Sequence, residues 1–467
     1  MIAWLKPHAE YKDSGLPWLG QVPRHWHTVR NGSLFGQRSQ TGYAELPILE
    51  VSLKTGVQVR SFGKVQRKQI MSDLGKYKRA AKGDLAYNTM RMWQGALGVC
   101  PVDGLVSPAY VVARPYPGVD PMYFAALFRT GEYMAEIDSA SRGIVKDRNR
   151  LYWDQFKQMQ SPCPPVDEQA AIVRFLDWAN GRLERAIKAK RKVIALLNEQ
   201  KQAIIHRAVT RGLEVSVPVK PSGIPWLGAI PKHWEVRKMK FLVSTIGGMT
   251  PNKGVARFWG GRVPWVSPKD MKRREIADSQ DHITEAALRE TNISVVPPPA
   301  VLIVVRGMIL ARTFPTAVTT VPVTVNQDMK VLTPKREMNA EFFVSLLTGI
   351  QRELLSLVEE AGHGTRCLRT DSWANFSVPL PPPTEQACIA EHLKTALAGV
   401  NTAISRLERE IELLREYRAR FVADVVTGKL DVRDAAARLP DEAPPETAED
   451  DAALSDEVEV ADEEAAA

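Results

Sequence analysis

The chain has 467 residues, of which 44% are hydrophobic, enough for two to four domains at about 100–200 residues each. No apolar run reaches the roughly 18 residues that cross a bilayer, no signal peptide opens the chain, and four scattered cysteines are typical of reduced thiols, so we expect a cytoplasmic protein without membrane contact. Residues 441–467 carry twelve acidic and no basic residues, which leaves 62 basic and 42 acidic residues in 1–440, a formal net charge of +20. This charge favours a nucleic-acid partner, although it also fits a generically basic soluble protein.

The first landmark in chain order recurs later in the chain. Ser14 to Trp26 (SGLPWLGQVPRHW) matches Ser222 to Trp234 (SGIPWLGAIPKHW) at nine of thirteen positions, at an offset of 208 residues. Two further pairs follow in the same order: Pro164–Gln169 with Pro382–Gln386, and Ala208–Leu213 with Val425–Leu430. We therefore predict two copies of one structural unit.

Roughly 140 residues of mixed texture follow each opening landmark. β-Rich runs punctuated by Gly and Pro are typical of strand-and-turn domains. Such runs occur at Gly104–Ala113, Ala300–Val305 and Ala317–Val325, and helical stretches are expected around Pro121–Ile137 and Ala340–Glu359. The sequence thus predicts two α+β globular domains.

A long helix is predicted after each Pro-Pro landmark. Asp167–Arg211 and Glu385–Thr427 each contain no proline and one glycine, and proline before an acidic first turn is a sound helix start. At about 1.5 Å per residue, each helix would run on the order of 60 Å.

The apolar residues of the second helix recur at steps of three and four, the heptad seam of a coiled coil, and those of the first helix follow this spacing more loosely. So narrow a stripe needs a partner, and two-fold pseudosymmetry would pair the two helices antiparallel. The predicted seam is Leu183, Ile187, Ile194, Leu197 and Ile204 in the first helix and Leu397, Val400, Ile404, Leu407, Ile411 and Leu414 in the second.

The end of the chain is acidic, rich in alanine and nearly free of large apolar residues from Pro440 onward. We predict a disordered tail, assigned to residues 433–467. The tail is either inert or a mimic of DNA charge that shields a basic groove.

These landmarks resemble those of type I restriction-modification specificity subunits, the HsdS family, over residues ~10 to ~432. The resemblance rests on the PWLG…P-x-His-Trp openings, the Pro-Pro-x-x-Glu-Gln helix starts and the stretch TGKLDV at Thr427–Val432. Further matching stretches are Lys82–Leu85, Val106–Tyr110, Gly247–Pro251, Trp265–Asp270 and Val325–Asp328. The second copy departs from the Gly-Asp-Leu pattern, with Pro299–Leu302 in its place.

The resemblance implies an α+β fold in which two target-recognition domains are separated by two long antiparallel coiled-coil helices, a pseudo-two-fold internal repeat. The implied boundaries are 1–165 and 213–382 for the recognition domains, 166–212 and 383–432 for the spacer helices, and 433–467 for the tail. Each domain would read half of a split double-stranded DNA target. A stiff spacer suits this task, because successive major-groove faces lie about 34 Å apart.

The same resemblance implies partners. The helices would dock two methyltransferase subunits, and restriction subunits with translocase and nuclease activity would join them. The chain itself would be a non-catalytic subunit without a cofactor, because S-adenosylmethionine, ATP and Mg²⁺ would be bound by the partner subunits.

Basic and amide side chains are the candidates for DNA contact, since Lys and Arg bind phosphates and Arg, Lys, Asn and Gln read base edges. In the first domain the candidates are Lys76, Lys78, Arg79, Arg91, Trp93, Gln94, Arg142, Lys146 and Arg148. In the second they are Lys269, Lys272, Arg273, Arg274, Arg306, Arg366 and Arg369.

The histidine–tryptophan pair of the opening landmark, His25-Trp26 and His233-Trp234, invites a catalytic interpretation. Identical apolar neighbours in both copies favour a packing role instead. No nucleophile or second carboxylate is expected beside these histidines, so we predict that they are structural.

Other functions are weighed against these features. The loop SPAY at Ser107–Tyr110 is similar to the S-P-P-Y loop of amino-methyltransferases, but the chain has neither F-x-G-x-G nor G-x-x-x-x-G-K-[ST], so no self-contained catalysis is expected. His363, Cys367, Cys388 and His392 lack the tight spacing of zinc ligands, and no metal is predicted. The remaining alternatives are a DNA-independent coiled-coil scaffold and the specificity subunit of a methylation-only system.

Overall fold

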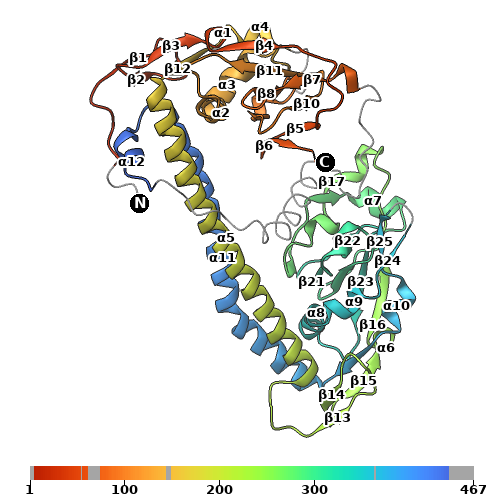
Figure 1. Cartoon of the computed structure of the whole chain (residues 1–467). Coiled ribbons are helices and arrows are strands. Elements are labelled where there is room, and N and C mark those ends of the chain that lie inside the picture. Colours follow the sequence, from red (N-terminus) through yellow and green to blue (C-terminus); the bar gives the residue numbers. More distant parts are fainter. Residues whose placement is uncertain (1–4, 54, 61–73, 143–148, 362–363, 441–467) are drawn as a thin grey trace. The chain divides into compact units, whose positions relative to one another are not determined.

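The computed structural model describes residues 5–53, 55–60, 74–142, 149–361 and 364–440. The chain divides into two units: unit 1 comprises residues 1–188 and 410–467, and unit 2 comprises residues 189–409. Each unit contains one globular head and one half of each of two long helices, α5 (Val166–Arg211) and α11 (Pro383–Val426) (Figure 1).

Head 1 (residues 5–165) is built on a four-stranded antiparallel sheet in the order β4-β11-β8-β9. In this sheet Val112 of β11 pairs with Arg38 of β4 on one side and with Ala86 of β8 on the other. The strands of head 1 are β1 (Tyr11–Asp13), β2 (Gln21–Pro23), β3 (His27–Arg30), β4 (Phe35–Arg38), β5 (Leu49–Ser52), β6 (Gly56–Val59), β7 (Lys78–Ala80), β8 (Leu85–Asn88), β9 (Leu97–Val99), β10 (Gly104–Val106), β11 (Tyr110–Pro115) and β12 (Gln160–Cys163), and its helices are α1 (Asn31–Leu34), α2 (Pro121–Phe128), α3 (Gly131–Ala140) and α4 (Trp153–Phe156).

The core of head 1 is rich in aromatic rings. Phe35 from β4 and Phe124 from α2 meet edge to face with ring centroids 5.5 Å apart, and both are fully buried. Burying one such side chain removes about 150–250 Å² from water. Side-chain caps start the helices, since Asp120 accepts from the Met122 N–H and Thr130 from the Tyr133 N–H.

Head 2 (residues 213–382) repeats this plan with one strand more, in the order β16-β23-β20-β21-β18. Its central strand β20 is buried along its whole length, which explains the unbroken apolar run of the sequence. The strands of head 2 are β13 (Val219–Pro221), β14 (Ala229–Pro231), β15 (Glu235–Lys238), β16 (Val243–Gly247), β17 (Trp259–Val266), β18 (Glu275–Ile276), β19 (Asp281–Ile283), β20 (Val301–Val304), β21 (Thr316–Thr319), β22 (Thr324–Val325), β23 (Met329–Pro334), β24 (Glu359–Glu360), β25 (Arg366–Cys367) and β26 (Ser377–Leu380), and its helices are α6 (Met239–Leu242), α7 (Glu285–Glu290), α8 (Ala340–Gly349), α9 (Gln351–Leu355) and α10 (Thr370–Ala374).

The opening landmark folds identically in both heads. Together with the three residues before it, the landmark forms the hairpins β1–β2 and β13–β14. The strand after each hairpin pairs with the strand before each long helix, β3 with β12 and β15 with β26. The predicted α+β heads and their internal repeat are confirmed. The predicted strand and helix runs overlap the observed elements, and Gly104–Ala113, Ala317–Val325 and both helical stretches are each divided into two elements.

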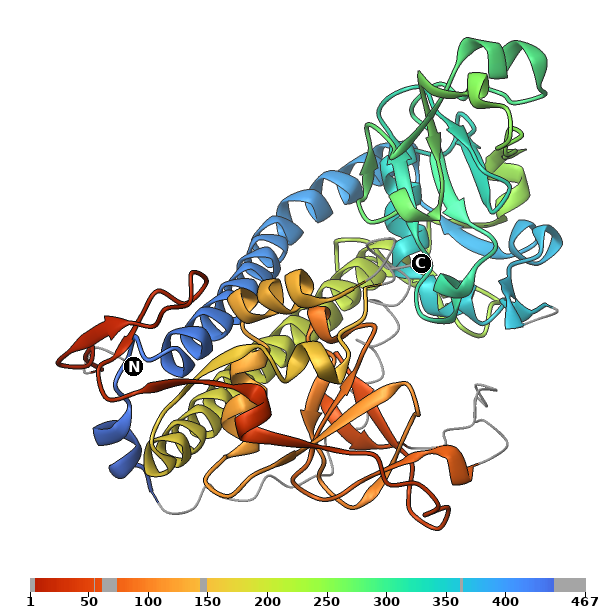
Figure 2. The same ribbon diagram turned by 90° about the horizontal axis from the view of Figure 1, so that it is seen from above.

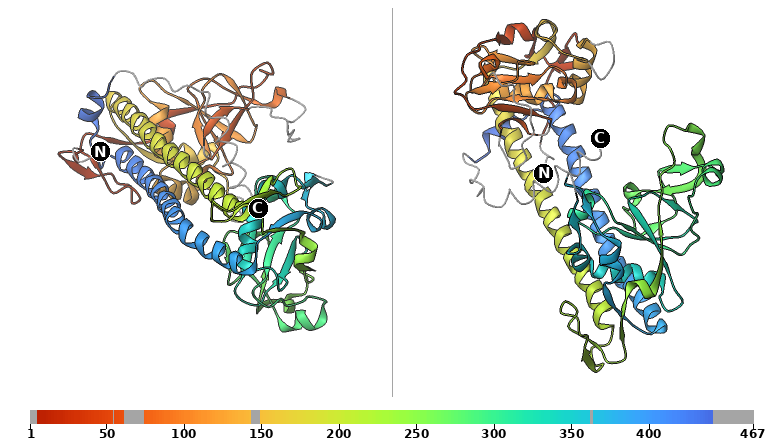
Figure 3. Two further views of the ribbon diagram at one scale, coloured as in Figure 1. Left: turned by 90° about the horizontal axis from the view of Figure 1, so that it is seen from below. Right: turned by 90° about the vertical axis from the view of Figure 1, so that its right-hand side faces the viewer.

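The long helices pair antiparallel within each unit. In unit 1 the first half of α5 packs on the second half of α11, where the Phe175 and Phe421 rings lie 5.9 Å apart and Arg418 pairs with Glu184. In unit 2 the halves are exchanged, and Lys201 Nζ donates to Asn401 at 2.8 Å. Both halves lie side by side in the two views of Figure 3. The predicted antiparallel pair of helices is confirmed.

The start of the tail differs from the prediction. Arg433–Ala437 forms the short helix α12, and its Ala435 and Ala436 are buried in the core of unit 1. Figure 2 shows the N-terminal strands (red) beside the end of α11 and α12 (blue). Assigning the tail from residue 433 was wrong for residues 433–440, because their small apolar side chains find a hydrophobic surface that the local composition does not reveal. Residues 441–467 lie outside the described residues.

Within the described ranges, no helix combines the length and the apolar character that a bilayer span requires.

Candidate nucleic-acid interface

One predicted contact site follows the central strand of head 1. After β8, Arg91 leads into a turn of 3-10 helix at Met92–Gln94, which ends on Gly95 in the left-handed conformation (φ 89°). Met92 is fully buried in the core of head 1, and Trp93 Nε1 donates to the Met90 carbonyl at 3.1 Å. These two contacts fix the position of the turn. Arg91 and Gln94 are exposed, and their side chains make no hydrogen bond or ion pair to another described residue.

Head 2 presents an arginine at the same topological place. β20 corresponds to β8 in sheet order, and Arg306 follows β20 before the 3-10 turn Met308–Ala311. The Arg306 side chain is exposed and has no ion-pair partner among the described residues. Each head therefore has, directly after the central strand of its sheet, one exposed arginine without an ion-pair partner among the described residues.

The basic cluster around β7 consists of Lys76, Lys78 and Arg79, and two of these side chains bind other residues of head 1. Lys78 Nζ donates to the Tyr110 carbonyl at 2.7 Å, and burial lowers the pKa of this ammonium. Arg79 donates to Asp103 at 2.9 Å and lies over the ring of Tyr43. Lys76 is exposed.

The third cluster of head 1 is described only in part. Arg142 is exposed, and its main chain pairs with that of Arg150. Lys146 and Arg148 lie outside the described residues.

The basic loop of head 2 that follows β17 is held by a capping box. Asp270 accepts from the Ser267 N–H at 2.8 Å and from the Ser267 hydroxyl. Lys269, Lys272 and Arg273 project from this fixed turn and are exposed. Arg274, in contrast, binds helix α8 through Ser345 at 2.7 Å and Glu341.

Two further candidates of head 2 are ion-paired on the β24–β25 hairpin. Arg366 lies 3.4 Å from Glu360, and Arg369 lies 2.7 Å from Glu359. The DNA contacts of all these candidates stay predictions.

A glutamate carboxylate contacts each histidine–tryptophan pair, Glu168 in head 1 and Glu385 in head 2. In clamp 1, which we define as His25, Trp26 and Glu168, the Glu168 carboxylate accepts from Trp26 Nε1 at 3.1 Å and contacts His25 Nε2 at 2.6 Å. In clamp 2, defined as His233, Trp234 and Glu385, one Glu385 oxygen contacts His233 Nε2 at 2.7 Å and accepts from Trp234 Nε1 at 3.0 Å. Each clamp joins its head to the first turn of a long helix, as a packing role would require, and the structural role of the histidines stays a prediction.

The sequence alone did not connect these carboxylates with the histidines. Glu168 and Glu385 belong to the Pro-Pro landmark, 143 and 152 residues away from their histidines along the chain. The recurrence of both landmarks in both copies was the signal that could have joined them.

The glutamine of the same landmark holds the neighbouring helix start. Gln169 Oε1 accepts the N–H of Asp120, the cap of α2, and Gln386 Oε1 accepts the N–H of Asn339, the cap of α8, both at 2.8 Å. Each glutamine also donates at 2.9 Å to the carbonyl of the proline five residues before it, Pro164 or Pro381. The landmark therefore satisfies buried backbone groups at the junction between head and helix.

The end of each long helix packs against the clamp at the start of the other long helix. Gly428 after α11 adopts a φ of 79°, and a Cβ there would lie 2.4 Å from Pro23 and 3.0 Å from Trp26. Gly212 after α5 adopts a φ of 77°, and a Cβ there would meet Glu385 at 3.1 Å and Trp234 at 3.3 Å. The third landmark thus contains a glycine because the chain turns tightly under a tryptophan.

The predicted seam residues are buried to different degrees. Leu183, Ile187, Leu397 and Ile411 are buried, while Ile194, Leu197, Ile204, Val400, Ile404, Leu407 and Leu414 are half-buried. At the end of α5 the register shifts, since Ile205 rather than Ile204 is buried against α8, where a Cβ on Gly349 would lie 3.3 Å from it. At this end of α5, contact with head 2 rather than the heptad spacing therefore determines which side chain is buried.

Catalytic and metal chemistry have few candidates. Of the cysteine–histidine set, His363 lies outside the described residues, and Cys367, Cys388 and His392 form no ligand group within the described part. Burial raises the pKa of the Cys100 thiol to about 12, so this cysteine is inert at neutral pH. One group of described residues has ligand atoms close enough to share a metal ion, and it consists of His8, His25 and Glu168.

Comparisons with known proteins agree with this architecture. Residues 231–413 match the family described as the type I restriction modification DNA specificity domain. The chain is 30% identical over 278 residues to the EcoR124I/EcoR124II specificity subunit of a type I restriction enzyme from Escherichia coli, covering 58% of this chain and 63% of that protein. It is 29% identical over 194 residues to the MjaIX specificity subunit of Methanocaldococcus jannaschii, covering 41% and 43%.

These two matches span less than two thirds of either relative. Similarity of fold extends further. A solved chain from a study of complex assembly and conformational transition of the type I R-M system superposes with a TM-score of 0.64 at 16% identity, over 88% of this chain and 99% of that chain.

Proposed function

Because the chain belongs to the family of type I restriction-modification specificity subunits, HsdS, we propose that it selects a bipartite double-stranded DNA target, with one half-site read by each head. The observation that carries this proposal is the exposed arginine after the central strand of each head, Arg91 and Arg306. Equivalent positions on otherwise different heads suit one reading task performed on two sequences.

Charge supports the same role. Residues 1–440 carry a formal net charge of +20, and exposed basic residues such as Lys272 and Arg273 stand on loops that follow strands. Lysine and arginine on phosphates supply affinity, whereas arginine on guanine edges supplies specificity. A DNA-independent scaffold would need neither feature.

The long helices are proposed to dock two methyltransferase subunits, through which restriction and translocase subunits join. Exposed apolar side chains on the helices support docking: Val193 and Leu196 on α5, and Leu413 and Tyr417 on α11. In this proposal the chain is non-catalytic, and the partner subunits bind S-adenosylmethionine, ATP and Mg²⁺. A methylation-only system would use the same chain, since the difference lies in the partners.

Domain exchange tests the bipartite reading. Replacing residues 222–382 by the corresponding domain of a homologue should change one half of the methylated target in cells and preserve the other half. Sequencing of methylated adenines reads both halves in one experiment. A change in both halves would refute one-head-per-half recognition.

Salt dependence separates DNA reading from scaffolding. With six to ten phosphate contacts, affinity for the target should fall about 10³–10⁵-fold between 50 and 200 mM salt. Binding that lacks both salt dependence and sequence preference would instead support the scaffold. The same titration with a scrambled duplex measures the sequence-independent part.

A further inference from the structure

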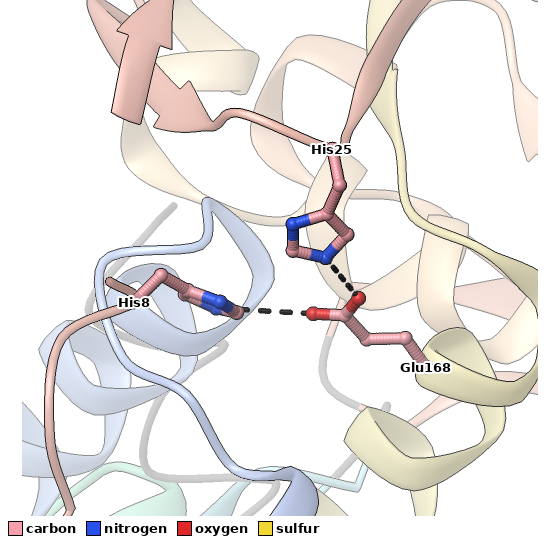
Figure 4. Close-up of side chains that lie close together, drawn as sticks. All are labelled: His8, His25 and Glu168. Atoms are coloured by element: carbon pink, nitrogen blue, oxygen red, sulfur yellow. Dashed lines mark hydrogen bonds and ion pairs between the residues drawn. The ribbon is translucent and has the colours of Figure 1, made fainter. Parts of the chain in front are cut away.

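Clamp 1 has an additional histidine that clamp 2 lacks. His8 Nε2 lies 3.8 Å from Glu168 Oε1, on the side of the carboxylate away from the 2.6 Å contact with His25 (Figure 4). The ligand atoms of His8, His25 and Glu168 all lie within 4.8 Å of one another. They come from three separate segments: the N-terminal segment, the turn before β3 and the first turn of α5.

The His8 ring is buried and incompletely partnered. Only 6% of the residue is exposed, and Nδ1 has no hydrogen-bond partner among the described residues. Asp431 Oδ2 faces this nitrogen at 3.7 Å. A buried ring nitrogen without a hydrogen-bond partner is unfavourable, and the Asp431 carboxylate is the nearby acceptor for an Nδ1–H.

The second copy shows that the clamp does not need this histidine. Clamp 2 joins His233 and Trp234 to Glu385 with the same contacts, and the offset of 208 residues places Ser216 where His8 stands. The contacts between the tryptophan, its histidine and the carboxylate therefore form without a residue equivalent to His8.

We propose that His8, His25 and Glu168 bind one divalent transition-metal ion of the Zn²⁺ class, with Asp431 accepting a hydrogen bond from His8 Nδ1. Imidazole nitrogen and carboxylate oxygen are ligands that zinc prefers. A carboxylate on the second ring nitrogen is the usual support of a metal-binding histidine. The His25 side chain is 40% exposed, which leaves water access for a fourth ligand.

The geometry needs small adjustments. At metal–ligand distances of about 2.0–2.2 Å, tetrahedral ligand atoms stand about 3.3 Å apart. The 2.6 Å contact between His25 Nε2 and Glu168 Oε2 therefore opens, and His8 Nε2, which lies 3.8 Å from Glu168 Oε1, moves toward the side of Oε2. Trp26 keeps Oε1 of Glu168, and Oε2 faces the ion.

Bound metal would fasten four segments of unit 1 together. His8 and Asp431 already join the two ends of the described chain, where the Asp431 N–H donates to the Lys6 carbonyl at 2.9 Å and the Tyr11 hydroxyl donates to the Lys429 carbonyl. Metal binding and closure of this junction are therefore coupled.

Titration of the full, untagged chain with Co²⁺ after treatment with a chelator tests the site. We expect one equivalent per chain with the visible absorption of four-coordinate Co²⁺, displaced by Zn²⁺. His8→Ala should weaken binding more than about 100-fold, and Asp431→Asn about 10–100-fold, the range of an outer hydrogen-bond partner. His233→Ala is the matched control in clamp 2 and should leave the affinity unchanged.

Far-UV circular dichroism of the metal-free variants establishes that they are folded. His25→Ala removes a second ligand, at a more exposed position, and should also weaken metal binding. Failure of the wild-type chain to take up one equivalent overturns the proposal. Equal affinity of the folded His8→Ala chain does the same.

Discussion

Clamp 1 and clamp 2 join the same residue types, but their carboxylates differ in burial. The side chain of Glu168 is 4% exposed and that of Glu385 is 28% exposed. In clamp 1 the two acceptor oxygens are divided between tryptophan and histidine, whereas in clamp 2 one oxygen serves both. One sequence landmark can therefore produce a tight and a loose junction, because the segments that cover it are different.

The largest expected contrast lies at the glycines beneath the tryptophans. Gly428→Ala must adopt a positive φ and also push against the Pro23 ring at 2.4 Å, so it should destabilise unit 1 by about 3 kcal/mol or more. Gly212→Ala meets its neighbours at 3.1–3.3 Å and should cost unit 2 about 1–2 kcal/mol. Amide hydrogen exchange at α2 and α8 measures each unit separately, and equal losses would show that the junctions do not differ.

Removing the carboxylates is expected to have the next largest effect. Glu168→Ala leaves the buried Trp26 N–H without an acceptor, which should cost about 2–3 kcal/mol, whereas water can replace the more exposed Glu385 and limit the cost of Glu385→Ala to about 1 kcal/mol. Protection of the first turns of α5 and α11 reports the loss. A larger effect at Glu385 would contradict the burial argument.

The two arginines compare the heads rather than the junctions. Arg91→Ala and Arg306→Ala should each cost about 1–3 kcal/mol of discrimination, each in a different half of the target, if each guanidinium reads a base. Binding to duplexes randomised in one half at a time measures this. Uniform weakening across sequences would assign these arginines to phosphates, and Arg369→Ala, whose guanidinium is paired with Glu359, is the control.

The smallest contrast concerns pH. Burial, opposed by Asp431 and Glu168, lowers the pKa of His8 from its ordinary 6.5. The neutral ring therefore contributes stability that is complete above about pH 6.5 and is lost as the pH falls through the lowered pKa. Calorimetry in chelator should show a Tm that falls with acidity more steeply for the wild type than for His8→Phe, and parallel curves would exclude His8 as the titrating group.

Much of the fold could be predicted because its signals are periodic or repeated. The proline-free segments gave the two long helices to within two residues, and the recurring landmarks gave two heads of one plan. The partners of individual charged side chains could not be predicted in this way. Arg79 and Arg274 read as exposed basic residues, yet Asp103 and Ser345, distant in sequence, engage them.

The sequence by itself determined the repeat, the antiparallel helices and the basic body, since these depend on composition and spacing along one chain. Tertiary structure alone decided that a carboxylate would receive each histidine–tryptophan pair, that residues 433–437 would fold, and that His8 would stand beside Glu168. Each of these depends on segments more than a hundred residues apart being brought together, and no local pattern encodes which distant surface a side chain will meet.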